Sequence, residues 1–233
     1  TVRSNALLET GHVKVMTRTY REIADQAPND LALGDVDSLL SSLRAAYPGM
    51  EWAPRIRFGG LLDVPDEQGE TKTQGPAMGI AVDLLGAESE EAERLNLESS
   101  IVRGRLPRAA NEIIVSDDLA RNLGIGIGDM ATLIGATSTG GMAIHNFTIA
   151  GTVRFGIKPL DRNTMIADIH DIQYALDMEN GASEILGFFP NLIYDPETAA
   201  GITASFNQRV VGPDEELAPV MVTPVSYTHL RAH

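Results

Sequence analysis

The only glycine array of the chain lies in the stretch GIGIGD, and glycine-rich loops can bind phosphate groups. A dinucleotide-binding loop has the spacing G-x-G-x-x-G and lies between a strand and the helix that it opens. Here Gly124, Gly126 and Gly128 follow a predicted helix and precede a predicted strand, so the order is reversed. The array therefore predicts a structural turn, and we expect no nucleotide or other cofactor at it.

Two further catalytic signatures are missing from the sequence. No segment matches G-x-x-x-x-G-K-[ST], the P-loop that holds the phosphates of ATP. Ser138 lies among glycines in GATSTGG, but it has neither the G-x-S-x-G spacing nor the strand-to-helix setting of a hydrolase nucleophile. We therefore expect the chain to use neither of these chemistries.

Histidine and cysteine form no metal-ligand pattern. The chain has no cysteine, which excludes disulfides and cysteine metal sites. Its five histidines lack the spacing of zinc ligands, and we expect each to be an ordinary surface or strand residue. They are His12, His145, His170, His229 and His233. The sequence thus predicts no metal site.

Neighbouring carboxylates could act as general acid and base, and the candidates are Asp117–Asp118 and Glu90–Glu91. Such catalysis needs one carboxyl group whose pKa is raised by burial. Asp117 and Asp118 follow Ser116 at the predicted start of a helix, where the helix dipole lowers a carboxyl pKa. We expect these residues to stabilise the helix terminus, and we expect no catalytic residue in the chain.

Net charge and apolar content narrow the classes of protein to which this chain can belong. The chain has 233 residues, of which 43% are apolar and 21% charged, as is typical of globular proteins. Its net charge of −14 argues against nucleic acid and anionic lipid as partners, because both need a basic surface. No apolar run approaches the roughly 18 residues of a membrane span. The chain begins at Thr1 without an initiator Met, so we interpret it as an excerpt of a longer gene product.

Gly104–Asp129 is the segment around which we expect the chain to be organised. Ile113–Val115 predicts a short strand, and Ser116 is a favourable N-cap for the helix that follows. Leu119 and Leu123 lie four residues apart and so share one face of that helix. The glycine that comes next is the residue type that ends helices in a left-handed conformation.

Apolar periodicity predicts the other elements. Alternation predicts strands at 11–18, 51–62, 78–84, 130–134, 144–153, 164–167, 185–194 and 220–222. Helical spacing predicts helices at 35–47, 168–180 and 195–206. A strand, a helix and a two-stranded hairpin in this order begin a ferredoxin-like or split βαβ unit, so the predicted fold class is α+β.

Single residues predict three details of these elements. Val13 and Val15 should point inward from the first strand, with Lys14 on its opposite face. Pro54 indicates an edge strand or a late-starting one, because proline cannot donate to a sheet ladder. Asp35 is expected to cap the helix that it precedes.

Four phrases in the chain carry a family resemblance. They are TGHVKV (10–15) with Tyr20, PRIRFGGLL (54–62), GRLPRAANEIIVSDDLARNLGIGIGD (104–129) and FTIAGTV (147–153). In their order and spacing they resemble the extracytoplasmic domains of MacB/FtsX-type ABC transporter permeases, a group that includes the lipoprotein-releasing LolC and LolE subunits.

The resemblance implies an α+β domain in which a Porter-like, βαβ-containing subdomain carries an inserted, smaller Sabre-like α+β subdomain. The implied division is 1–98 and 182–224 for the Porter-like subdomain and 99–181 for the Sabre-like one. Residues 225–233, VSYTHLRAH, have no pattern that connects them to the rest, and we interpret them as a non-native tail.

The resemblance also implies a function without catalysis in this chain. Such a domain lies on the periplasmic side of the bacterial inner membrane, between the first and second membrane helices of a permease. There it couples ATP-driven movement of those helices to movement of a periplasmic substrate or partner, in lipoprotein release or efflux. The implied partners are an ABC ATPase subunit and a second permease subunit.

In the LolC branch, a hook-like hairpin grips a periplasmic lipoprotein carrier, and the corresponding stretch here is 136–146. It has no Lys, Arg or Pro, and Met142 and Ile144 are its only apolar candidates for partner contact. We therefore expect no carrier binding through this hairpin. A free-standing extracytoplasmic binding module and a soluble enzyme of unknown type remain the alternative functions.

Overall fold

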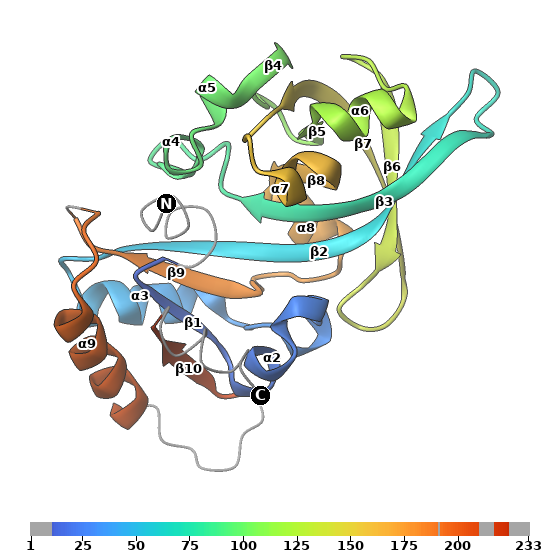
Figure 1. Cartoon of the computed structure of the whole chain (residues 1–233). Helices are drawn as coiled ribbons and strands as arrows, with labels where there is room; N and C mark the ends of the chain where they lie inside the picture. The colour runs from blue at the N-terminus through green and yellow to red at the C-terminus, as the bar shows by residue number, and fades with distance from the viewer. Residues whose placement is uncertain (1–10, 191, 210–216, 224–233) are drawn as a thin grey trace. The chain divides into compact units, whose positions relative to one another are not determined.

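The computed structural model describes residues 11–190, 192–209 and 217–223. Residues 225–233, which we interpret as a non-native tail, lie outside the described residues. The chain divides into two compact units (Figure 1), one formed by Thr1–Arg55 with Asn180–His233 and the other by Ile56–Glu179. None of the described helices is long and apolar enough to cross a membrane.

In the described part of the first unit, four antiparallel strands pair in the order β10-β1-β9-β2. Its strands are β1 (Val13–Thr17), the first five residues of β2 (Glu51–Pro65), β9 (Glu184–Phe188) and β10 (Pro219–Val222). Among the described residues, this part of β2 pairs only with β9, so Pro54 lies in an edge strand as predicted.

Helices accompany that sheet and supply much of its core. They are α2 (Arg18–Glu22), η2 (Ala24–Gln26), η3 (Asn29–Leu31), α3 (Val36–Ala46) and α9 (Pro196–Arg209). The predicted helix at 35–47 is confirmed as α3, whose Leu40 and Leu43 are buried in one cluster with Val13, Trp52 and Phe206. Burial of such side chains is the main stabilising contribution to a core of this kind.

The expected one-sided burial of β1 is wrong, because both of its faces are buried. His12, Lys14 and Met16 are buried, as Val13 and Val15 are. Lys14 can be buried because its Nζ lies 2.6 Å from a carboxylate oxygen of Glu184 on β9. A buried charge is tolerated only with such a partner.

The prediction that the Asp35 side chain caps α3 is also wrong. Asp35 adopts a left-handed conformation with φ of 48° and gives the described helix no side-chain cap bond. Instead, Asn180 accepts from Val36 N through its backbone oxygen and from Asp37 N through Oδ1, each at 3.0 Å. The orphan amides at the helix start are thus satisfied by a residue far along the chain.

The second unit is built on the remainder of β2 and six further strands. They are β3 (Thr71–Val82), β4 (Ile101–Gly104), β5 (Glu112–Ser116), β6 (Met130–Ala136), β7 (Met142–Val153) and β8 (Thr164–Asp168). The pairing order is β2-β3-β8-β5-β7-β4, and β6 pairs with both β7 and β2. Strand β6 thus connects β7 back to β2 through backbone hydrogen bonds.

Five short helices belong to the second unit. They are α4 (Glu91–Arg94), α5 (Leu97–Ser100), α6 (Asp117–Leu123), α7 (Lys158–Asn163) and α8 (Ile169–Ala175). Most strand pairs among the described residues are antiparallel, and within them only β3–β8 and β5–β7 are parallel. The mixture of helices and mainly antiparallel strands agrees with the predicted α+β class.

The division between the units differs from the expected one at its first boundary. The second unit begins at Ile56, whereas the resemblance implied an inserted subdomain that starts at residue 99. The β2–β3 hairpin pairs with β8 and β6, which places it with the later strands. The second unit ends at Glu179. The subdomain boundaries at 99 and 181 that the resemblance implies stay a prediction.

Candidate functional site

The most connected polar group of the second unit is the carboxylate of Asp117. The buried strand β5 ends at Ser116, whose extended backbone (φ −60°, ψ 141°) leads directly into α6. Asp117 is the first residue of that helix, and its side chain is completely buried. An unpaired charge in such a position would be strongly destabilising, so the contacts of Asp117 decide its role.

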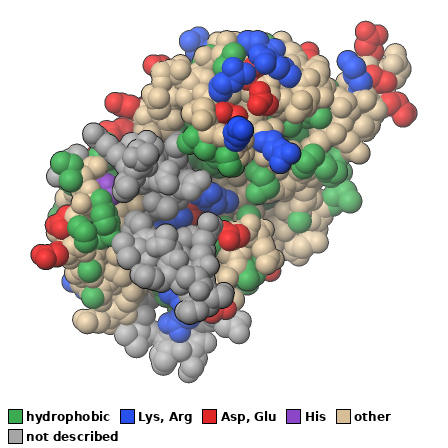
Figure 2. All heavy atoms as spheres, in the orientation of Figure 1, with side chains coloured by type: hydrophobic (Ala, Val, Ile, Leu, Met, Phe, Trp, Pro, Cys, Tyr) green, Lys and Arg blue, Asp and Glu red, His purple; other side chains and the backbone are tan. Residues whose placement is uncertain are grey.

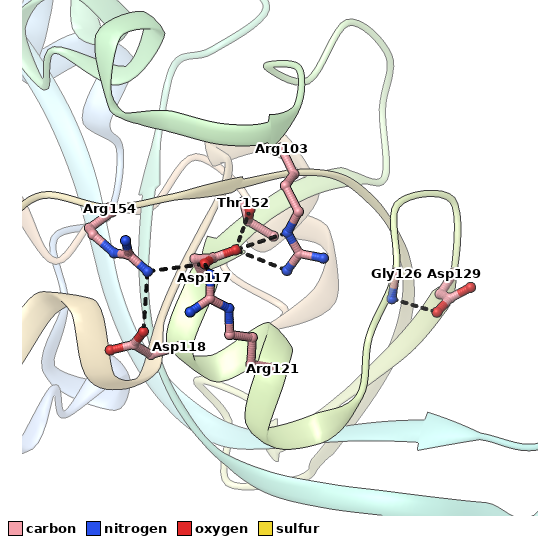
Figure 3. A network of polar contacts seen from close by, with 8 residues as sticks. All are labelled: Arg103, Asp117, Asp118, Arg121, Gly126, Asp129, Thr152 and Arg154. Atoms are coloured by element: carbon pink, nitrogen blue, oxygen red, sulfur yellow. Dashed lines mark hydrogen bonds and ion pairs between the residues drawn. The ribbon is translucent and has the colours of Figure 1, made fainter.

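Four side chains from separate parts of the second unit donate to Asp117 (Figure 3). Arg103 Nε and Thr152 Oγ1 each lie 2.9 Å from Oδ1. Arg121 Nη2 and Arg154 Nη2 lie 2.7 and 3.1 Å from Oδ2. These donors come from β4, β7, α6 and the residue after β7. A single carboxylate thus ties the edge strand β4 to α6 and to the end of β7.

The charge balance around Asp117 keeps its carboxylate ionised. Burial raises its pKa, but the hydrogen bonds from Thr152 and Arg103 and the charges of Arg103 and Arg121 outweigh burial, so the pKa lies below the ordinary value of 3.8. An acid-base role would need a raised pKa. The shift in the pKa of Asp117 is thus opposite in direction to the one that an acid–base role needs.

The arginines of this network remain open to solvent although their shared partner is buried. The exposed fractions of the side chains are 40% for Arg103, 62% for Arg121 and 45% for Arg154. Figure 2 shows Lys and Arg side chains gathered around acidic ones over the part of the unit that holds β4 and α6. The network therefore has a buried acidic centre and an exposed basic rim.

Ser116 contributes less than the sequence predicted. It occupies the N-cap position, but its hydroxyl makes no cap bond and, among the described residues, Oγ is buried without a hydrogen-bond partner. Asp118, the other expected terminus residue, is half exposed and lies 3.6 Å from Arg154 Nη2. The helix start is thus held mainly through Asp117.

The glycine array forms the predicted turn. Gly124 ends α6 with φ of 66°, and Ile125 N donates to Ala120 O at 2.8 Å, as in a left-handed helix stop. Gly126 N then donates to Asp129 Oδ2 at 2.6 Å, which closes the turn before β6 (Figure 3). The backbone amides of this array are directed at the protein itself.

A second ion pair fixes the loop between β4 and β5. Arg105 makes a bidentate contact with Glu112, at 2.7 and 2.6 Å, and Arg108 N donates to the same carboxylate. The hydrogen bonds from Arg105, together with that from Arg108 N, lower the pKa of Glu112 to about 2. Both residues lie within the longest of the four family-like phrases, 104–129. The ion pair therefore gives two residues of that phrase a structural role.

The described histidines hold ordinary structural contacts. His12 is buried, stacks on Phe189 and accepts from Phe189 N at 2.8 Å, and burial lowers its pKa. His145 Nε2 lies 2.7 Å from Asn111 Oδ1, and His170 Nδ1 lies 3.1 Å from Asp168 Oδ1. Within the described ranges, no group of three or more His, Asp or Glu could hold a metal ion. His229 and His233 fall outside those ranges.

The partner-contact candidates Met142 and Ile144 lie on an exposed face of the second unit's sheet. Their exposed fractions are 73% and 63%. Ile144 is paired with Ile134 of β6, which is paired in turn with Leu61 of β2. The exposed Met78 and Met130 share this face by register. The two candidates thus continue a strand and share its face with other exposed apolar side chains.

Sequence reasoning missed the arginine network. The spacing of Asp117 and Arg121, four residues apart on a helix, was the one local signal for it. Arg103 and Arg154 lie 14 and 37 residues from Asp117, and they reach it only because β4 and β7 are neighbours in the sheet. The spacing of residues in a single sequence does not reveal contacts between residues so far apart along the chain.

Comparison with known proteins shows a shared fold. No family model and no curated protein matches the chain. Among solved structures, the chain is similar to the periplasmic region of MacB from Actinobacillus actinomycetemcomitans, with a TM-score of 0.55 and 8% sequence identity. The similarity covers 97% of this chain and 94% of the other. The two share a fold over nearly their whole length.

Proposed function

We propose that this chain is the extracytoplasmic domain of an ABC transporter permease subunit. The observation that carries the proposal is the fold shared with the periplasmic region of MacB over nearly all of both chains. The four family-like phrases support it independently, because they come from sequence and span residues 10 to 153. Fold alone does not define function, so the proposal rests on both observations together.

In this proposal the domain works on the periplasmic side of the inner membrane. It transmits ATP-driven motion of the membrane helices to a periplasmic substrate or partner, in lipoprotein release or efflux. The unit that contains β1, β9 and β10 is the Porter-like subdomain, and the unit from Ile56 to Glu179 is the Sabre-like one. An ABC ATPase subunit and a second permease subunit are the proposed partners.

We further propose that this chain is not itself an enzyme and that ATP is hydrolysed in a separate domain or subunit. The sequence lacks a P-loop. The most buried carboxylate of the candidate site is held ionised by arginines, which suits a structural or binding role better than proton transfer.

Recovery of the complete gene tests the proposal. We expect an apolar segment of about 20 residues on each side of the region that encodes this chain, as two flanking membrane helices require. A complete reading frame without such segments would favour a free-standing binding module. A frame that adds a catalytic domain with its own nucleophile or metal motif would favour an enzyme.

A further inference from the structure

The arginines around Asp117 exceed what its charge requires. The carboxylate has about four lone-pair sites, and Arg103, Thr152, Arg121 and Arg154 fill them. One arginine would neutralise this single negative charge. Three guanidinium groups therefore lie close together. The single negative charge of Asp117 offsets only part of the repulsion between their positive charges.

The same geometry leaves hydrogen-bond donors free on the outer side. A guanidinium group has five N–H donors. Arg121 engages Asp117 through Nη2 alone, and Arg154 uses the same atom for both Asp117 and Asp118. Within the described ranges, no hydrogen bond or ion pair engages the remaining donors of these two residues, and their side chains are 62% and 45% exposed. The buried carboxylate holds these groups in place and so lowers the entropy cost of binding a second anion.

Nearby acids do not occupy these donors. Asp118 is half exposed and lies 3.6 Å from Arg154, which is a loose contact. Asp161 is buried and accepts from Phe155 N at 2.6 Å, so its carboxylate is turned into the protein. With three arginines against Asp117 and Asp118, the network keeps a net charge of +1. Lys158 and Arg162 add exposed charge on α7, which packs against α6.

Two exposed apolar residues lie close in sequence to arginines of the basic rim. Val102 precedes Arg103 on the edge strand β4 and is 41% exposed. Ile157 follows Arg154 by three residues and is 38% exposed. Protein–protein interfaces combine apolar side chains with arginine and are depleted in lysine. A free phosphate ion would make no use of such apolar neighbours.

We propose that Arg103, Arg121 and Arg154 form a binding site for an acidic segment of a partner protein. Glutamate or aspartate carboxylates of that segment contact the free guanidinium donors, and its apolar side chains contact Val102 and Ile157. The net charge of −14 favours such a segment over an anionic membrane, because the wider field of the chain repels a large polyanion. The inference rests on this network alone and does not depend on the proposed function.

Fluorescence anisotropy with a labelled peptide of alternating glutamate and leucine tests the site on the full chain. We expect binding at low salt that weakens when the salt is raised to about 0.5 M, as for any contact between exposed charges. Arg121→Gln should weaken binding about fivefold, the upper range for one exposed ion pair. The double variant with Arg154→Gln should weaken it about 25-fold if the two contacts are independent.

Matched controls separate the site from general charge effects. Arg44→Gln removes one exposed arginine from α3 in the other unit and should leave binding unchanged. A glutamine–leucine peptide should not bind. Equal weakening by Arg44→Gln, or no binding of the acidic peptide by the unaltered chain, would overturn the proposal. Binding of inorganic phosphate or phosphatidylglycerol vesicles instead, lost with the same variants, would overturn it in favour of a phosphate site.

Chemical-shift mapping on the unaltered chain covers the case in which a variant fails to fold. The acidic peptide should shift backbone amides of β4, α6 and residues 154–158. Shifts confined to other elements would contradict the site without any substitution.

Discussion

Asp117 shows how much of this molecule depends on one carboxylate. It is buried at the start of a helix, its pKa is lowered, and its donors come from parts of the chain that only the fold brings together. The sequence predicted an ionised group that stabilises a helix terminus. That prediction was right about the ionised state, but it missed the arginines that decide it.

Replacing Asp117 by Asn should lower the free energy of unfolding by about 1–3 kcal/mol at pH 7, because a buried charge-assisted network is lost. The folded-state pKa of Asp117 lies below 3.8, so its contribution is complete above that value and disappears as the pH falls through the folded pKa. The difference between the unaltered chain and Asp117→Asn in urea denaturation should therefore shrink below pH 4. A difference that persists undiminished at pH 2 would contradict this.

The predicted elements around α6 were largely recovered because local patterns determine them. The β-branched run, the apolar spacing of Leu119 and Leu123 and the terminal glycine all appear as β5, α6 and a left-handed stop. Features that depend on partners distant in sequence could not be predicted. Examples are the cap that Asn180 gives to α3 and the ion pair that permits burial of Lys14.

Leu123→Ala should destabilise the chain far more than Asp118→Ala. Leu123 is 6% exposed, and its Cδ2 atom lies so close to Gly75 of β3 that a side chain there would touch it. Truncation of a buried leucine costs about 2–5 kcal/mol. Asp118 is half exposed and is expected to contribute about 0.3–1 kcal/mol at the helix terminus. Similar losses from both variants in urea denaturation would show that α6 does not pack as described.

The hairpin of β6 and β7 is expected not to bind a lipoprotein carrier. Its turn is closed by Thr137 and Gly141, and Ser138 Oγ donates to Asp177 O at 2.6 Å. Rigid aromatic or arginine anchors, which dominate binding energy, do not occur between residues 136 and 146. Pull-down of such a carrier by the chain, abolished by Met142→Asp, would show that this expectation is wrong.

For the whole molecule, the α+β class was predictable from the sequence, whereas the implied subdomain boundaries stay a prediction. Strand pairings at long range place the β2–β3 hairpin in the unit from Ile56 to Glu179. Periodicity identifies a strand without identifying its neighbours, and the boundary depends on the neighbours.

Removal of residues 225–233 should leave the melting temperature essentially unchanged. Residues 1–224 should remain soluble without detergent, be mostly monomeric and unfold cooperatively, because they contain the alternating strands and amphipathic helices of the prediction. Calorimetry of the shortened and complete chains compares them directly. A fall of many degrees would show that the tail belongs to the native structure.

Membrane topology of the parent protein tests the central claim most directly. The chain has no cysteine, so Glu67→Cys in the exposed turn between β2 and β3 introduces a single thiol into it. In cells with a permeabilised outer membrane and an intact inner membrane, a maleimide that cannot cross membranes should label this position fully. Labelling that requires disruption of the inner membrane would place the domain in the cytoplasm and contradict an extracytoplasmic role.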